Sequence, residues 1–148
     1  MKRVFVILFI LALGGFQFGY NAAVISGVIL LASKTFALSL TEQGWAMGML
    51  FLGAALGGYG SGFLADWRGR RGSLFWAASF FVLGGVLGYS ATSFPLFLLA
   101  RFFQGVGVGL VSLLVPLYIA EWAEPHKRGQ YSTLNQVAIA LGMLVAYG

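Results

Sequence analysis

Residues 4–31 form an apolar run without a charged side chain, and this run most constrains what the chain can fold into. A helix needs ~20 mostly apolar residues to cross the hydrocarbon of a bilayer. Further stretches of similar length follow, and short polar or charged segments separate them. The predicted transmembrane helices, about five, cover residues 4–31, 44–65, 73–92, 95–120 and 130–148. The sequence therefore predicts an all-α membrane protein.

The composition supports lipid as the solvent of this chain. Of its 148 residues, 59% are hydrophobic and 9% are charged, and the mean hydropathy is +0.89. A typical soluble domain carries about 25% charged residues. A soluble chain of this length could not bury so much apolar surface, because small domains bury only part of theirs. The bilayer is therefore the first expected partner.

Several classes of function are disfavoured by what the sequence lacks. There is no cysteine and only one histidine, His126, so we expect no disulfide, no metal site and no cofactor. No nucleophile, base and orienting group can be assembled from the acidic residues, so we do not expect an enzyme. The net charge of +5 resides in short loops rather than on a basic surface with interleaved aromatics, so a nucleic-acid partner is not expected.

The basic residues predict the orientation of the helices. Seven of them fall on one side of the predicted bundle: Lys2, Arg3, Arg68, Arg70, Arg71, Lys127 and Arg128. Only Lys34 falls in a loop on the other side. Because positive residues stay in the cytoplasm, the N-terminus is predicted to be cytoplasmic. A cleaved signal peptide is the alternative for the first run, but the run is longer than the usual 7–15-residue apolar core.

Glycines recur at a spacing of four residues along the predicted helices. Small residues at this spacing let two membrane helices approach closely, so we expect nearly all of these glycines to serve helix packing. The pairs are Gly44/Gly48, Gly53/Gly57, Gly58/Gly62, Gly84/Gly88 and Gly105/Gly109.

Three polar side chains stand out within the first and fourth predicted spans, where polar groups are costly. Gln17 and Asn21 share a helix face; they either join helices by hydrogen bonds or line a polar path. Arg101 lies about 9 Å into its helix and Asn21 about 15 Å into the first helix, from the rise per residue. An arginine side chain can span that difference, so an Arg101–Asn21 contact is one alternative and snorkelling of Arg101 to the surface is the other.

Two further segments carry more polar residues than are needed to orient the helices in a membrane. The loop predicted at 66–72 reads DWRGRRG, in which Gly69 permits a tight turn beside Asp66 and three arginines. The last span begins with a polar run in which Gln136 shares a face with Ile139. This start is either a frayed helix end or an amide beside an apolar contact, which suits a polyhydroxylated ligand.

Four segments, in the correct order, resemble motifs of one family. The loop GFLADWRGRR resembles the loop 2–3 motif of the major facilitator superfamily through Gly62, Asp66, Gly69, Arg70 and Arg71. The stretches FQGVGVG and PLYIAE, followed by Arg128 and Gly129, resemble the sugar-porter signature at the end of the fourth helix. NQVAIALG and FGYNAAVISG resemble the motifs of the fifth and first helices. Together they cover nearly the whole chain.

This resemblance implies a fold and a set of roles. The fold would be the N-terminal portion of a twelve-helix transporter made of two six-helix halves, working by alternating access to carry a monosaccharide. Gln136 would bind sugar hydroxyls, and Phe18 and Ile139 would line the pocket. A cytoplasmic gate would consist of Asp66, Gly69, Arg70, Arg71, Glu121 and Arg128. A plasma (cell inner) membrane location is implied as well.

Asn21 is a departure from the proton-coupled members that this chain resembles. Those members carry an aspartate at this position, which pairs with the arginine matching Arg101. An amide cannot titrate, so the chain is expected to be a facilitative carrier. The alternatives are a proton symporter with its proton site elsewhere, a carrier for another solute, and a non-transporting fragment or sensor. The resemblance also implies that the sixth helix and the C-terminal half of the transporter lie outside this sequence. The C-terminal half is therefore an expected partner of this chain.

Overall fold

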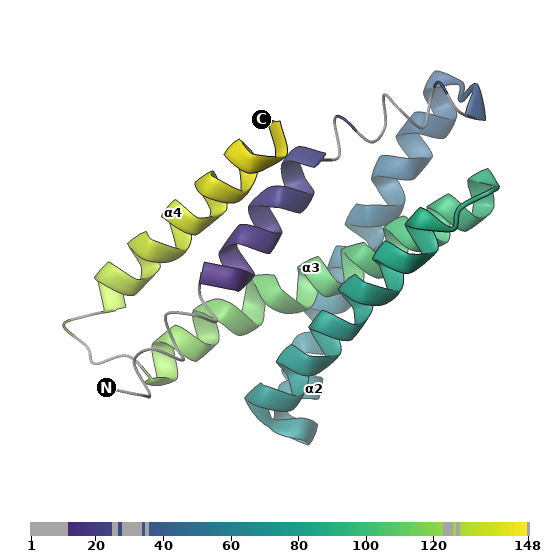
Figure 1. The fold of residues 1–148 in the computed structure, drawn as a ribbon. Coiled ribbons are helices and arrows are strands. Elements are labelled where there is room, and N and C mark those ends of the chain that lie inside the picture. The colour runs from purple at the N-terminus through teal and green to yellow at the C-terminus, as the bar shows by residue number, and fades with distance from the viewer. Residues whose placement is uncertain are drawn as a thin grey trace. The chain divides into compact units, whose positions relative to one another are not determined.

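The computed structural model describes residues 12–24, 27, 34, 36–122, 126 and 128–147. Within these ranges the chain is helical apart from short turns, and no strand occurs. A helix covers 12–24 and is followed by α2 (Leu40–Tyr89), α3 (Phe94–Trp122) and α4 (Arg128–Tyr147) (Figure 1). The predicted all-α class is confirmed. Of the first predicted span, 4–31, only 12–24 and 27 lie inside the described residues.

α2 begins with a capping box that the sequence provides locally. The Ser39 hydroxyl accepts from the backbone N–H of Glu42 at 3.3 Å, and the Glu42 carboxylate accepts from the backbone N–H of Ser39 at 2.8 Å. Two backbone donors that the first turn would leave unpaired are thereby satisfied. This exchange fixes where the helix starts.

The 50 residues of α2 cannot form a single membrane span. A straight helix of that length would measure about 75 Å, more than twice the ~30 Å of bilayer hydrocarbon. The helix is broken at Gly69, where φ is 74° and ψ is 166°, and the chain reverses direction there (Figure 1). The predicted spans 44–65 and 73–92 lie on either side of this residue. The loop predicted at 66–72 is wrong in extent: the backbone leaves the helical conformation only at Gly69, because one residue with positive φ is enough to turn the chain.

The chain divides into two compact units. We call Ser26–Leu114 the α2–α3 unit, and Met1–Ile25 together with Val115–Gly148 the α4 unit. The α2–α3 unit holds both halves of α2 and the first two-thirds of α3. The α4 unit holds the helix at 12–24, the last turns of α3 and all of α4. α3 contains Pro116, close to the point at which one unit ends and the other begins.

In the α2–α3 unit, the first half of α2 packs against α3 along a seam of glycines, which we call the glycine seam. It consists of Gly53 and Gly57 on α2 and Gly105 and Gly109 on α3. A Cβ added to any of these four would run into a backbone carbonyl oxygen of the opposite helix. The helices therefore touch through their main chains, which only residues without side chains permit.

The second half of α2 packs on roughly the opposite face of α3. A Cβ at Gly84 would lie 3.0 Å from the carbonyl oxygen of Ala100, and a Cβ at Gly107 would lie 3.2 Å from that of Ala77. The rings of Phe80 and Phe103 stack across this contact with centroids 6.0 Å apart. α3 is thus held between the two halves of α2.

The packing role predicted for the glycine pairs is confirmed for some of them and stays a prediction for the others. It holds for both pairs of the glycine seam and for Gly84. A Cβ at Gly44, Gly48 or Gly62 would meet nothing within 4 Å among the described residues. Gly107, which belongs to none of the predicted pairs, is closely packed.

In the α4 unit, the helix at 12–24 lies beside α4 and runs in the same direction (Figure 1). Gly15 faces Asn135 and Ala138, and one turn later Gly19 faces the backbone of Ile139. From the other side, Gly142 meets the backbone of Phe16 and Tyr20. The contacts advance together along both helices, which is the register of a parallel pair.

Large apolar side chains cover the outside of the helices. Among the described helices, Leu40–Tyr89 and Phe94–Leu117 are long and apolar enough to cross a membrane. Phe51, Phe63 and Phe75 on α2 each expose about two-thirds or more of their surface. In water such a surface would drive aggregation, whereas against lipid tails it carries no penalty.

Candidate functional site

The three predicted sugar-binding residues lie in the α4 unit, on the parallel helix pair. Phe18 and Ile139 are half-buried and Gln136 is exposed. Successive helix residues are rotated by about 100°, so positions can be placed relative to the contact line of the pair. Phe18 lies roughly a quarter turn from the line marked by Gly15 and Gly19. Gln136 and Ile139 are rotated toward that same side from the line marked by Gly142.

The three side chains therefore share one flank of the pair, which we call the α4 flank. The shared side follows from the parallel register, because Phe18 and Gln136 are rotated in opposite senses from their contact lines, and on two parallel helices opposite senses lead to the same side. An aromatic ring, an aliphatic side chain and an exposed amide thus lie on the same flank. Such a surface suits a ligand with an apolar ring face and hydroxyl groups.

Two further amides lie in the same helix pair, one of them buried and the other half-buried. Asn21 is buried, and its Nδ2 donates to the carbonyl oxygen of Gln17 at 3.0 Å, one turn earlier in the same helix. Asn135 precedes Gln136, and its Oδ1 is buried without a hydrogen-bond partner among the described residues. That oxygen occupies the space left by the missing side chain of Gly15, 2.5 Å from where a Cβ would be. The sequence singled out Asn21 but assigned no role to Asn135.

Arg101 is buried in the α2–α3 unit, with 3% of its surface exposed. Its Nη1 donates to Oε1 of Gln104 at 2.8 Å, one turn further along α3. Its Nε and Nη2 are buried and have no hydrogen-bond partner among the described residues. Snorkelling to the surface is therefore wrong for this residue. Gln104 carries no role in the sequence prediction, although its position three residues after a buried arginine was the signal that could have identified it.

The contact predicted between Asn21 and Arg101 stays a prediction. Asn21 belongs to the α4 unit and Arg101 to the α2–α3 unit. Each makes its hydrogen bond within its own helix, to Gln17 and Gln104 respectively.

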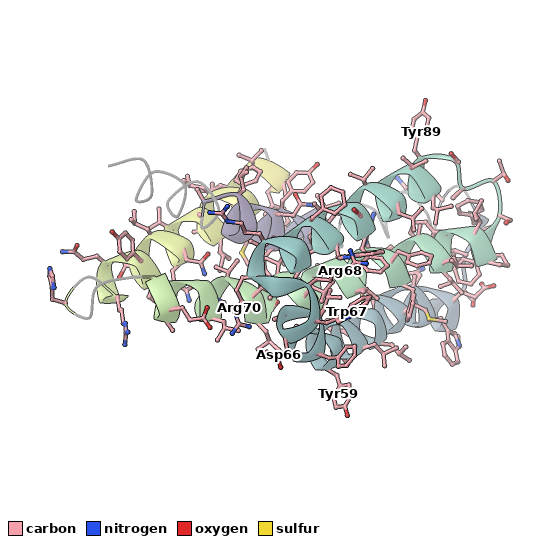
Figure 2. The ribbon with its side chains drawn as sticks, turned by 90° about the horizontal axis from the view of Figure 1, so that it is seen from below. Tyr59, Asp66, Trp67, Arg68, Arg70 and Tyr89 are labelled. Atoms are coloured by element: carbon pink, nitrogen blue, oxygen red, sulfur yellow. The ribbon has the colours of Figure 1, made fainter. Side chains whose placement is uncertain are left out.

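Four of the predicted gate residues meet at the turn of α2, namely Asp66, Gly69, Arg70 and Arg71. Figure 2 shows Asp66, Trp67, Arg68 and Arg70 gathered around this turn, while Tyr59 and Tyr89 point away from their helices. The guanidinium of Arg68 lies over the ring of Trp67, 4.6 Å from its centroid, which is a cation–π contact. The turn thus carries an exposed carboxylate and three arginines within six residues of the chain.

The other two predicted gate residues, Glu121 and Arg128, lie in the α4 unit. Both are exposed, at the end of α3 and the start of α4. Among the described residues, no three His, Cys, Asp or Glu side chains gather closely enough to hold a metal ion. The arrangement offers hydrogen bonds and charges rather than reactive groups.

A family model matches this chain, and curated relatives match it as well. The family described as "Sugar (and other) transporter" matches residues 7–148. The D-xylose transporter of Levilactobacillus brevis is 40% identical over 136 residues, covering 92% of this chain and 30% of that protein. Solute carrier family 2, facilitated glucose transporter member 10 of Mus musculus is 38% identical over 136 residues, covering 92% of this chain and 25% of that protein.

The fold is similar to that of a solved transporter. The crystal structure of a D-xylose-proton symporter matches with a TM-score of 0.87 and 34% sequence identity, over 97% of this chain and 39% of that one. The chain therefore spans about a quarter to two-fifths of the length of these relatives.

Proposed function

Because the chain belongs to the family of sugar (and other) transporters within the major facilitator superfamily, we propose that it carries a monosaccharide across a membrane by alternating access. The family match over residues 7–148 is the observation that carries this proposal. The matched relatives are membrane transporters and not enzymes, and two of them are named for D-xylose. The C-terminal portion seen in the longer relatives is proposed as the partner that completes the site.

The α4 flank supports a sugar site made of Phe18, Gln136 and Ile139. In this proposal the exposed Gln136 amide, which both donates and accepts, pairs with sugar hydroxyls. Phe18 and Ile139 contribute apolar contact to the carbon-bound face of the ring. A bound sugar ring would cover this amide, and a covered polar group without a partner is costly, so the amide selects for hydroxylated ligands.

The sugar site is tested by uptake of radiolabelled D-xylose, D-glucose and D-galactose into proteoliposomes that contain the product of the complete reading frame. Gln136→Ala is expected to raise KM for the preferred sugar about tenfold, the usual scale for a lost hydrogen bond in a site. Gln130→Ala is the matched control, because it removes an exposed amide of the same helix from the other side of α4. Equal KM values for the two variants would remove Gln136 from the site.

We further propose that carriage is facilitative. Asn21 has no proton to release near neutral pH, and it is hydrogen-bonded to Gln17 within its own helix. A coupling cycle at this position would need a group that changes charge. A protonophore should therefore leave the final sugar level in energised vesicles unchanged.

Replacing the amide by a carboxylate tests the same position directly. Asn21→Asp is expected to make uptake depend on pH, whereas Gln17→Glu, one turn away on the same face, is the control. An unchanged pH profile in Asn21→Asp would show that Asn21 is not the coupling position.

Proton coupling is the second candidate, and one observation favours it: the structural relative with a TM-score of 0.87 is a D-xylose-proton symporter. In that case sugar accumulates against its gradient in the wild-type protein, and a protonophore abolishes the accumulation. A carrier for a different solute would show neither behaviour with any of the three sugars.

The turn of α2 is proposed to face the cytoplasm of a cell-membrane protein and to form a gate with Glu121 and Arg128. The three arginines at the turn support this orientation, since positive residues remain inside. The chain has no cysteine, so single cysteines report sidedness once any cysteine in the rest of the complete protein is replaced. A membrane-impermeant maleimide should label Thr92→Cys in intact cells and Trp67→Cys only after permeabilisation. The reverse pattern would overturn the orientation, and with it the cytoplasmic N-terminus.

A further inference from the structure

Arg101 is a buried cation in a helix long and apolar enough to cross a membrane, and its surroundings in the α2–α3 unit hold no opposite charge. No ion pair of Arg101 occurs among the described residues, and its one hydrogen bond goes to the neutral amide of Gln104. A charge in such a place is costly and needs a fixed partner. The partner here lies on the same helix.

The chemistry of the two side chains fixes how they pair. Arginine has five N–H donors and no acceptor, so only the carbonyl oxygen of the Gln104 amide can face it. The Nη1–Oε1 distance of 2.8 Å is that of a charge-assisted hydrogen bond. The other two nitrogens, Nε and Nη2, are buried without a hydrogen-bond partner among the described residues, so Gln104 supplies the one hydrogen bond of this guanidinium there.

Gly84 on the second half of α2 makes the space that Gln104 occupies. A Cβ at Gly84 would lie 2.6 Å from Cγ of Gln104 and 2.9 Å from its backbone nitrogen. At the neighbouring Gly85, a Cβ would meet nothing within 4 Å of the described residues. Gly88, one turn later, would place its Cβ at an ordinary 3.9 Å from Nε2. The contact is therefore specific to one glycine.

We propose that Gln104 is the positioning residue of Arg101: packed against Gly84, it holds the guanidinium in place for the transport cycle with a neutral acceptor. The part of this inference that concerns transport rests on the proposed sugar carriage. Gln104 then contacts both Gly84 on α2 and Arg101 on α3. Through these two contacts, α2 fixes the orientation of the Arg101 guanidinium. Gln104 itself does not contact the sugar.

The test measures modification of Arg101 by phenylglyoxal, read by mass spectrometry of the peptide that contains it, in the full-length protein. Gln104→Met keeps the shape of the side chain and removes the acceptor, and labelling of Arg101 should rise about tenfold, the scale of a hydrogen bond to a charged group. Gln104→Glu keeps an acceptor oxygen at this position, so its labelling should remain as low as in the wild type. Gly84→Ala should raise labelling, and the matched control Gly85→Ala should not.

Transport kinetics provide the second measurement. Gln104→Met is expected to lower kcat and leave KM for the sugar unchanged, because the residue acts on Arg101 and not on the ligand. If Gln104→Met does not yield a monodisperse protein, Gly84→Ala against Gly85→Ala decides the question alone.

Each outcome has a definite meaning. Unchanged labelling in Gln104→Met and Gly84→Ala overturns the positioning role altogether. Raised labelling with unchanged kcat overturns its part in carriage. Raised labelling in a protein whose wild type takes up no sugar refutes the proposed function and still supports Gln104 as the residue that holds Arg101.

Discussion

Two glycines on α2, twelve positions apart, are required for opposite reasons. Gly69 has φ of 74° and ψ of 166°, a conformation that essentially only glycine adopts, but a Cβ there would meet nothing within 4 Å of the described residues. Gly57 is an ordinary helical residue, but its Cβ would run into the carbonyl oxygen of Val106. The turn of α2 needs glycine for its backbone, and the glycine seam needs it for space.

The largest effect is expected at the seam. Gly57→Ala forces α2 and α3 apart, because the obstacle is backbone and cannot rotate away. Overpacking of this kind should lower the free energy of unfolding by about 3 kcal/mol, the upper part of the usual range. Thermal unfolding in detergent micelles measures it.

The control for that variant is Gly60→Ala, in the same half of α2, where a Cβ would meet nothing within 4 Å of the described residues. Its melting temperature should match or slightly exceed that of the wild type. If Gly57→Ala and Gly60→Ala have the same melting temperature, moving the two helices apart costs no free energy. The glycine seam would then not require glycine for space.

A smaller loss is expected at the turn. Gly69→Ala meets no steric obstacle but must hold a side chain at positive φ, which should cost about 2 kcal/mol. The loss should arise without any change in the α2–α3 contact, so cross-linking between cysteines placed at Ala54 and Val108 should proceed as in the protein with Gly69. Disrupted cross-linking would show instead that the turn also sets the packing of the helices.

Much of this architecture could be predicted from the sequence, because a helix that crosses a bilayer needs a minimum apolar length. Apolar length predicted the helices, and spacing of four predicted Gly53/Gly57 and Gly105/Gly109 as packing residues. Spacing alone could not show that Gly44, Gly48 and Gly62 differ from these four in having no close neighbour among the described residues. Which face of a helix meets another depends on where the chain turns, and the single-residue turn at Gly69 was predicted as a longer loop.

The candidate site divides in the same way. Asn21, Arg101 and Gln136 were visible because a polar side chain is conspicuous in an apolar run. Gln104 and Asn135 were passed over, since their significance depends on contacts with Gly84 and Gly15 that join distant parts of the chain. A sequence pattern shows which side chains one helix carries, whereas the role of an amide at a helix contact depends on the helix packed against it.

The smallest effect should be found next to the largest, at Gly58. A Cβ on this residue would lie 3.7 Å from Cδ1 of Leu113 and 4.0 Å from the carbonyl oxygen of Gly109, which is ordinary van der Waals contact. Gly58→Ala should therefore stabilise the protein slightly, by about 0.5 kcal/mol, because alanine loses less backbone freedom than glycine in a helix. The variant shares its helix turn, depth and chemical change with Gly57→Ala and differs only in direction around α2. If both variants have a lowered melting temperature, this whole turn of α2 is sensitive to substitution, and the contact with the Val106 carbonyl is not the cause. If only Gly57→Ala has a lowered melting temperature, its loss of stability is assigned to that one backbone contact.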